Sequence, residues 1–157
     1  MPEPGETAPD FALPLDDGST FTLSSERGHP VVLYFYPQDE TEGCTIENRA
    51  FTALAPQFAE LGVTVIGISP DSVESHCAFR DKHGLALPLA ADPDHKVIDA
   101  YGLWQLKKMF GNSYMGVKRG TVLIDADGRI FRTVMAPRVK DHADKVLTAT
   151  REMVATA

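Results

Sequence analysis

The chain has 157 residues, the length of one ordinary domain, and its 43% hydrophobic and 24% charged residues are close to globular averages. This composition excludes a disordered chain and a fibrous repeat. The formal net charge of -7 disfavours nucleic acid or an anionic membrane as an obligate partner, because both are polyanions. A small neutral substrate fits this charge better.

The N-terminus favours a protein that stays in the cytoplasm. Residues 1–6 lack the basic start and apolar run of a secretory signal, and no apolar stretch approaches the roughly 18 residues of a membrane span. The chain has two cysteines, Cys44 and Cys77. A reducing compartment does not maintain a purely structural bridge, so any disulfide between them is expected to be transient chemistry.

The first predicted elements are a hairpin and a central strand. Residues 10–22 predict a short hairpin, an N-terminal extension, around a polar turn at Asp16-Asp17-Gly18-Ser19. The run Val31-Val32-Leu33-Tyr34-Phe35-Tyr36 is continuously apolar and β-prone, as expected for a strand covered on both faces, and Pro37 ends it.

Helical and extended segments then alternate. A helix is predicted from near Cys44 to Gly62 because apolar residues recur at helical spacing: Phe51, Leu54, Phe58 and Leu61. Residues 63–69 predict a second buried strand. Pro70-Asp71-Ser72 is a helix-start signal, followed by a segment that runs to Gly84.

The C-terminal half predicts a short strand at 89–91, a short helix at 95–101, a hairpin of 121–124 with 130–134, and a final amphipathic helix over 143–154. No repeat, linker or low-complexity tract divides the chain, so residues 1–157 are predicted to form a single domain. Parallel βαβ units that precede an antiparallel hairpin predict an α/β fold. It has a mixed central sheet flanked by helices on both faces and is compatible with a thioredoxin-like fold.

Cys44 lies where a central strand gives way to a helix. If Thr41 is the N-cap, Cys44 is the third helical residue, and its sulfur can face unpaired backbone N–H groups and the positive end of the helix dipole. A free thiol with a pKa of ~8.5 is only about 3% ionised at pH 7, and about 90% ionisation requires ~3.4 kcal/mol of differential stabilisation. A helix terminus supplies ~0.3 to 2 kcal/mol, so a reactive thiolate here also needs a nearby cation such as an arginine.

Pro37, Thr41 and Cys44 reproduce the Pro-x-x-x-Thr-x-x-Cys signature of peroxiredoxins. Further segments resemble the bacterioferritin comigratory protein or PrxQ-type branch of that family: residues 70–76, 92–94, 101–104 and 114–119. The likeness extends from about Gly5 to the final helix, and it implies a thioredoxin-like peroxiredoxin domain.

The resemblance implies a role for each matching residue. Cys44 becomes the peroxidatic cysteine, Thr41 the hydroxyl that orients the peroxide, and Arg119 the required cation. Pro37 shields the pocket from water, while Glu47, one turn beyond Cys44, holds Arg119 by a salt bridge. The implied step is attack of the thiolate on a peroxide oxygen, which gives a sulfenic acid and water or an alcohol.

The chain departs from the branch at two positions. Glu42 replaces the proline that many members carry before the Gly-Cys pair, and we expect its carboxylate to point to solvent. Many relatives carry a second cysteine five residues after the first, where this chain has Arg49. Other members place it on the helix after the second βα unit, where Cys77 lies one helical turn before the matching position, Arg80. Cys77 is therefore a candidate for the resolving cysteine, and a disulfide with Cys44 is expected to need unwinding at the start of the Cys44 helix.

Less specific interpretations compete with these roles. Cys77 can be ordinary packing, Thr41 only a helix cap and Arg119 only a surface charge. His76, Cys77 and His83 lack the compact ligand pairs of a zinc site, so neither metal nor cofactor is expected. The aromatic residues near Arg119 are expected in the core or the pocket wall, where they can also admit bulky organic hydroperoxides: Trp104, Phe110 and Tyr114.

The resemblance predicts a thiol peroxidase that reduces hydrogen peroxide and alkyl hydroperoxides and is recycled by thioredoxin or a similar dithiol. Relatives of the branch are commonly monomeric or weakly dimeric. A one-cysteine cycle with an external thiol and a peroxide sensor or holdase remain alternatives. A thioredoxin-like disulfide oxidoreductase is disfavoured, because Cys44 is followed by Thr45, Ile46 and Glu47 rather than by a second cysteine two residues on.

Overall fold

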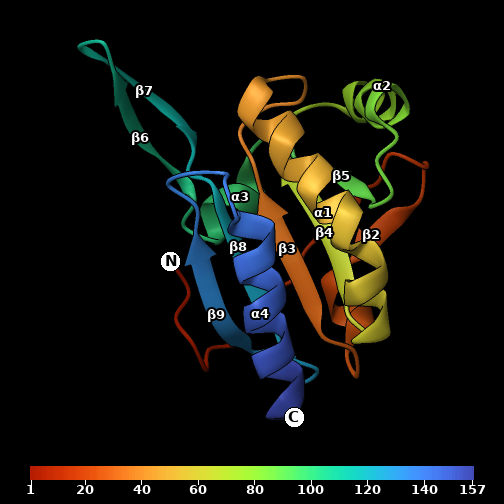
Figure 1. Cartoon of the computed structure of the whole chain (residues 1–157). Helices are drawn as coiled ribbons and strands as arrows, with labels where there is room; N and C mark the ends of the chain where they lie inside the picture. Colours follow the sequence, from red (N-terminus) through yellow and green to blue (C-terminus); the bar gives the residue numbers. More distant parts are fainter.

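The computed structural model describes residues 1–157 and is built around a five-stranded mixed sheet with the order β5-β4-β3-β8-β9 (Figure 1). The strands are β3 Val31–Phe35, β4 Thr64–Ser69, β5 Leu89–Ala91, β8 Gly120–Ile124 and β9 Ile130–Met135. β3, β4 and β5 are parallel, whereas β8 and β9 pair antiparallel. The predicted mixed sheet is confirmed.

Alternation along β3 divides its side chains between two cores. Val32 and Tyr34 belong to the core packed under α1 Glu42–Glu60, α2 Val73–His83 and α4 His142–Ala155. Val31, Leu33 and Phe35 belong to the opposite core, which is completed by the N-terminal hairpin and α3 Lys96–Ala100. Helices therefore cover both faces, as predicted, and the continuous apolar run of β3 is explained by burial on both sides. None of the helices is both long and apolar enough to cross a membrane.

The N-terminal hairpin is part of the core rather than a peripheral addition. It pairs β1 Ala12–Pro14 with β2 Thr20–Thr22 and is followed by a 3-10 turn at Leu23–Glu26. Its turn begins at Asp16, which is buried. The backbone N–H of Asp16 donates to the Leu89 carbonyl at 3.0 Å, and its carboxylate accepts from the Leu89 N–H at 3.0 Å. The hairpin thus covers the edge of β5 and brings a carboxylate to α2.

The main difference from the predicted elements is a two-stranded ribbon, β6 Trp104–Met109 with β7 Asn112–Val117, which projects from the body of the molecule (Figure 1). Its turn has positive φ at both Phe110 (51°) and Gly111 (79°), as two-residue hairpins require. The expected place of the aromatic residues was wrong for two of them, because Phe110 is 95% exposed at the tip and Tyr114 is 42% exposed. Only Trp104 is partly buried, and it stacks on His95.

Candidate active site

The strand pairing brings Cys44 and Arg119 to the same end of the sheet, where β3 ends and β8 begins. β3 and β8 are antiparallel neighbours, with Phe35 opposite Gly120. The chain that leaves β3 toward α1 therefore starts beside the residue that enters β8. Two positions that are 75 residues apart in sequence become neighbours through one strand pairing.

The Cys44 sulfur is buried, with 1% exposure, and faces a guanidinium. Arg119 Nη2 lies 3.4 Å from Cys44 Sγ, and Arg119 Nη1 donates to Glu47 Oε1. Burial lowers the pKa of Arg119, but the charges of Glu47 and Cys44 outweigh it and hold that pKa above the ordinary value. A guanidinium held by a buried carboxylate thus faces the sulfur at a distance where it can donate a hydrogen bond.

The position of Cys44 in α1 agrees with the predicted helix start, since Thr41 is the N-cap and Cys44 the third residue of α1. Thr41 makes no side-chain capping bond, and its hydroxyl instead donates to the Gln38 carbonyl at 2.9 Å. Glu42, in the first turn, is exposed as expected. The N–H groups at this helix start are therefore not used by the Thr41 side chain.

The Cys44 backbone is fixed from inside the core. Asn48 Nδ2 donates to the Cys44 carbonyl at 2.9 Å, and the Tyr34 hydroxyl donates to Asn48 Oδ1 at 2.7 Å. The Tyr34 ring stacks on Phe51 at 4.3 Å between centroids. It also lies over Gly67, where a Cβ would stand 2.6 Å from the ring. A glycine on β4 thus makes room for the side chain that holds the first turn of α1.

A depression of about 410 Å³ opens beside the site, with Pro37 and Arg119 in its wall. The ribbon contributes Leu106, Lys107 and Lys108, so the unpredicted element borders the approach to Arg119. The lysines make this approach positive although the chain as a whole is negative.

Comparisons with known proteins agree with this geometry. The AhpC/TSA family model matches residues 4–132. A Bacillus subtilis protein named peroxiredoxin Bcp is 45% identical over 151 residues, covering 96% of both chains, and the Escherichia coli peroxiredoxin Bcp is 36% identical over 148 residues, covering 94% of this chain and 95% of the other. The chain belongs to the AhpC/TSA family of peroxiredoxins.

A solved structure places this peroxiredoxin in the predicted branch. The bacterioferritin comigratory protein of Xanthomonas campestris, studied for its alkyl peroxide reduction activity, superposes with a TM-score of 0.90 at 36% identity, covering 97% of this chain and 99% of that one. The fold is thus the thioredoxin-like fold of Bcp and PrxQ proteins, and the chain is an enzyme with thiol-dependent peroxidase activity.

Cys77 lies away from Cys44 in this peroxiredoxin. Its half-buried thiol donates to the Asp16 carbonyl at 2.9 Å, beside β5, whereas the Cys44 sulfur contacts the residue that enters β8. Three strand spacings separate β5 from β8, which is roughly 14 Å. Arg80, at the position where the branch aligns a cysteine, is bound to the Asp16 carboxylate at 2.7 Å.

A buried histidine, which the sequence did not single out, completes the back of the site. His142, the first residue of α4, bonds Thr121 Oγ1 at 2.8 Å and lies 3.9 Å from Glu47 Oε2, which is buried without a hydrogen-bond partner. Burial raises the pKa of Glu47 to about 7, although Arg119 lowers it. Burial, together with the positive charges of Arg119 and Lys145, lowers the pKa of His142 to about 4.

A second unpredicted group surrounds Asp39, in the loop between Pro37 and Thr41. Its buried carboxylate accepts from the Tyr36 hydroxyl at 2.7 Å and contacts His76 Nδ1 at 2.8 Å. Burial raises the pKa of Asp39, but His76 and the hydroxyl donors outweigh that effect and hold the pKa below its ordinary value. The signal in the sequence was an acidic residue inside the signature loop.

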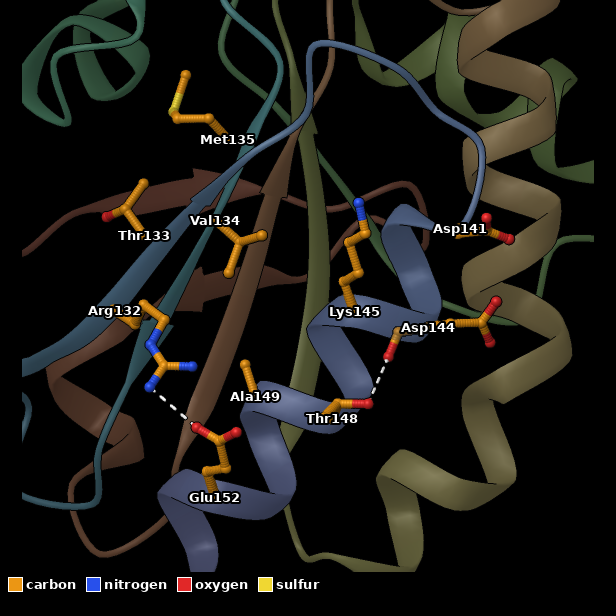
Figure 2. A pocket seen from close by; sticks show the side chains of 10 residues that line it. All are labelled: Arg132, Thr133, Val134, Met135, Asp141, Asp144, Lys145, Thr148, Ala149 and Glu152. Atoms are coloured by element: carbon orange, nitrogen blue, oxygen red, sulfur yellow. Dashed lines mark hydrogen bonds and ion pairs between the residues drawn. The ribbon is translucent and has the colours of Figure 1, made fainter.

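The largest cavity, about 620 Å³, lies elsewhere, between β9 and α4 (Figure 2). Its walls include an ion pair of Arg132 with Glu152 at 2.9 Å, and Lys145 points into the space between the strand and the helix (Figure 2). Neither Cys44 nor Arg119 lines it. The largest cavity therefore does not coincide with the sulfur–guanidinium contact in this protein.

Proposed function

We propose that this peroxiredoxin reduces hydrogen peroxide and alkyl hydroperoxides by attack of the Cys44 thiolate on the terminal peroxide oxygen. The sulfur–oxygen bond forms as the oxygen–oxygen bond breaks, and the leaving oxygen takes up a proton to become water or an alcohol. Cys44 becomes a sulfenic acid. The single observation that carries this proposal is the Arg119 Nη2 to Cys44 Sγ distance of 3.4 Å, with the guanidinium held by buried Glu47.

The surrounding residues supply positioning. Arg119 stabilises the thiolate and the charge on the departing oxygen, since its fork can donate to two atoms at once. The Thr41 hydroxyl orients the peroxide at the helix start, and Pro37 narrows the access of water. Glu47 keeps the guanidinium from turning to solvent. These roles follow the signature, and the contacts of Arg119 with Cys44 and Glu47 support two of them.

The cycle closes when Cys77 attacks the sulfenic acid, giving a Cys44–Cys77 disulfide and water, and thioredoxin or a similar dithiol reduces that disulfide. The separation of the two thiols implies a movement of α1 before the bond forms, because bridged cysteines have Cα atoms within about 7 Å. We place the enzyme in the cytoplasm as a single-domain monomer or weak dimer, without nucleic acid or membrane as a partner.

Stopped-flow mixing of the reduced protein with hydrogen peroxide tests the first step. The expected rate constant exceeds that of free cysteine by several orders of magnitude and is abolished in Cys44→Ser. A rate no faster than free cysteine, or one unchanged in Cys44→Ser, removes the peroxidase role of this residue. Insulin reduction without peroxide turnover would instead support a disulfide oxidoreductase.

Intact mass and peptide mapping after peroxide treatment test the second step. A loss of two hydrogens with Cys44 bridged to Cys77 is expected, and Cys77→Ser should over-oxidise or require an external thiol. Sulfenic and sulfinic acid alone in the wild type would favour the one-cysteine cycle. A trapped mixed disulfide with another protein and little turnover would favour a sensor or holdase.

A further inference from the structure

We infer that Asp39 and His76 are positioning residues that hold the loop of the reactive cysteine against helix α2 and set the rate at which oxidised Cys44 reaches Cys77. The inference rests on the proposed two-cysteine cycle. It assigns a role in that cycle to a pair of residues that touch neither sulfur.

The Asp39–His76 contact is buried and hydrogen-bonded on both sides of the imidazole ring. His76 Nδ1 lies 2.8 Å from Asp39 Oδ2, and His76 Nε2 lies 3.1 Å from the Ala90 carbonyl. Both partners are hydrogen-bond acceptors, so the His76 ring joins the loop of Asp39 to the backbone of β5. The two side chains are 0% and 2% exposed. The remaining capacity of the carboxylate is filled by the hydroxyls of Tyr36 and Ser75, each at 2.7 Å.

The next residue of the same loop makes a second, exposed contact with α2. Glu40 Oε2 bonds Lys82 Nζ at 2.9 Å, and Glu40 Oε1 bonds His83 Nε2 at 2.9 Å. The Glu40 backbone has a φ of 65°, which is rare for a residue with a Cβ. Two consecutive acidic residues therefore contact opposite ends of α2: Asp39 binds near its start and Glu40 near its end.

The loop they fix runs directly into the first turn of α1. Resolution requires Cys44 to leave the guanidinium of Arg119 and approach Cys77, which stands on α2 next to His76. Asp39 precedes Cys44 by only five residues, and the inference requires that this movement displaces Asp39 from His76. The reaction that follows joins the sulfenic sulfur of Cys44 to the thiol sulfur of Cys77, with release of the sulfenic oxygen as water.

The same pair therefore acts on the two steps in opposite ways. While the Asp39–His76 contact is intact, Thr41 and Cys44 keep the arrangement in which they react with peroxide. While it is closed, Cys77 also stays out of reach, and a second peroxide can convert the sulfenic acid to sulfinic acid. The strength of the Asp39–His76 pair sets the balance between resolution and over-oxidation.

Asp39→Asn tests this inference, with Glu40→Gln as the matched control in the adjacent position. Rapid mixing with peroxide, acid quenching and intact mass follow Cys44 oxidation and disulfide formation as separate steps. A hydrogen bond to a charged carboxylate corresponds to roughly ten- to hundredfold in an opening equilibrium, so disulfide formation in Asp39→Asn should accelerate by that factor. Exposed pairs stabilise little, so Glu40→Gln should change it by less than about threefold. The peroxide concentration that gives half sulfinic acid should rise in Asp39→Asn by the same factor as the disulfide rate.

The pair is merely structural if disulfide formation in Asp39→Asn is unchanged, or slows together with oxidation. Should Asp39→Asn fail to fold, His76→Gln carries the same test, because it removes the ring that joins Asp39 to the Ala90 carbonyl. A wild-type protein that oxidises fast but forms no internal disulfide overturns this inference and the two-cysteine cycle together, and leaves the peroxidase step standing. A wild-type disulfide with no Asp39 effect overturns this inference alone.

Discussion

Glu47 and His142, the buried pair behind Arg119, make opposite contributions to the pH dependence of stability. The pKa of Glu47 is raised by burial from 4.5 to about 7, so the folded protein keeps a proton that the unfolded chain loses in that window. Stability from Glu47 therefore falls as the pH rises from 4.5 to 7. The pKa of His142 is lowered by burial from 6.5 to about 4, so its contribution is present above 6.5 and is lost as the pH falls toward 4.

The two contributions have similar size. Each pKa is displaced by about 2.5 pH units, and each pH unit is about 1.4 kcal/mol, so either group alone changes the free energy of unfolding by at most about 3.5 kcal/mol across its window. Between pH 4.5 and 6.5 the two changes have opposite signs and cancel. The wild type should therefore show little pH dependence from this pair.

Replacing either residue should reveal the pH dependence of stability that the other residue contributes. In Glu47→Gln, urea denaturation should give a free energy of unfolding that rises by up to about 3.5 kcal/mol from pH 4 to 6.5, which is the contribution of His142. In His142→Gln it should fall by a similar amount from pH 4.5 to 7, which is that of Glu47. Glu60→Gln, an exposed position on the same helix as Glu47, is the control and should keep the wild-type slope. Wild-type slopes in both variants, or slopes of the reverse sign, would refute the assignment of charge states behind Arg119.

Three further predictions concern other parts of the molecule. Arg119→Lys should lower the rate constant of Cys44 oxidation by about 10²-fold, because an ammonium cannot donate to the sulfur and to Glu47 at once. The control Arg49→Lys, at an exposed position, should not lower it, and equal rates in the two variants would contradict the role of the Arg119 guanidinium. Tyr34→Phe leaves Asn48 Oδ1 without its buried donor, so the free energy of unfolding in urea should fall by about 1–3 kcal/mol, and a change as small as that of exposed Tyr114→Phe would count against it. Phe110→Ser, at a ribbon tip 95% exposed, should change that free energy by less than about 0.5 kcal/mol, and a larger loss would mean that the ring is buried in solution.

Local patterns predicted the elements whose side chains face a core. The apolar run of β3 predicts a buried strand because both of its faces are covered, and Ser72 and Gly84 mark the ends of α2 through a capping bond and a left-handed residue. The ribbon of β6 and β7 was not predicted. Most of its side chains are exposed, so no alternation between core and solvent was available to mark it.

The sequence predicted the signature residues of the site, which lie together in one segment of the chain. The signature loop and the helix start indicated Cys44 directly, whereas Arg119 was identified through the family resemblance, because the neighbouring positions of β3 and β8 are a tertiary fact. Asp39 with His76, and Glu47 with His142, were missed for the same reason. Each pair joins a residue near Cys44 to a helix far along the chain, 37 residues on for His76, and neither residue type is unusual where it stands.

The first turn of α1 is held on two sides by separate groups of buried polar side chains, and this separation has a physical consequence. On the β8 side, Glu47 fixes the guanidinium that faces the sulfur. On the α2 side, Asp39 and His76 fix the loop that leads to it. A single network could not favour the thiolate and also release the helix start, because stabilising the anion in place would raise the cost of moving it. With two groups, Glu47 and Arg119 can set how strongly the site stabilises an anionic sulfur. Asp39 and His76 can separately set how readily the start of α1 opens. In the proposed cycle, oxidation of Cys44 to a neutral sulfenic acid weakens the attraction to Arg119. The contact between Asp39 and His76 is then the barrier that we propose decides when Cys77 is reached.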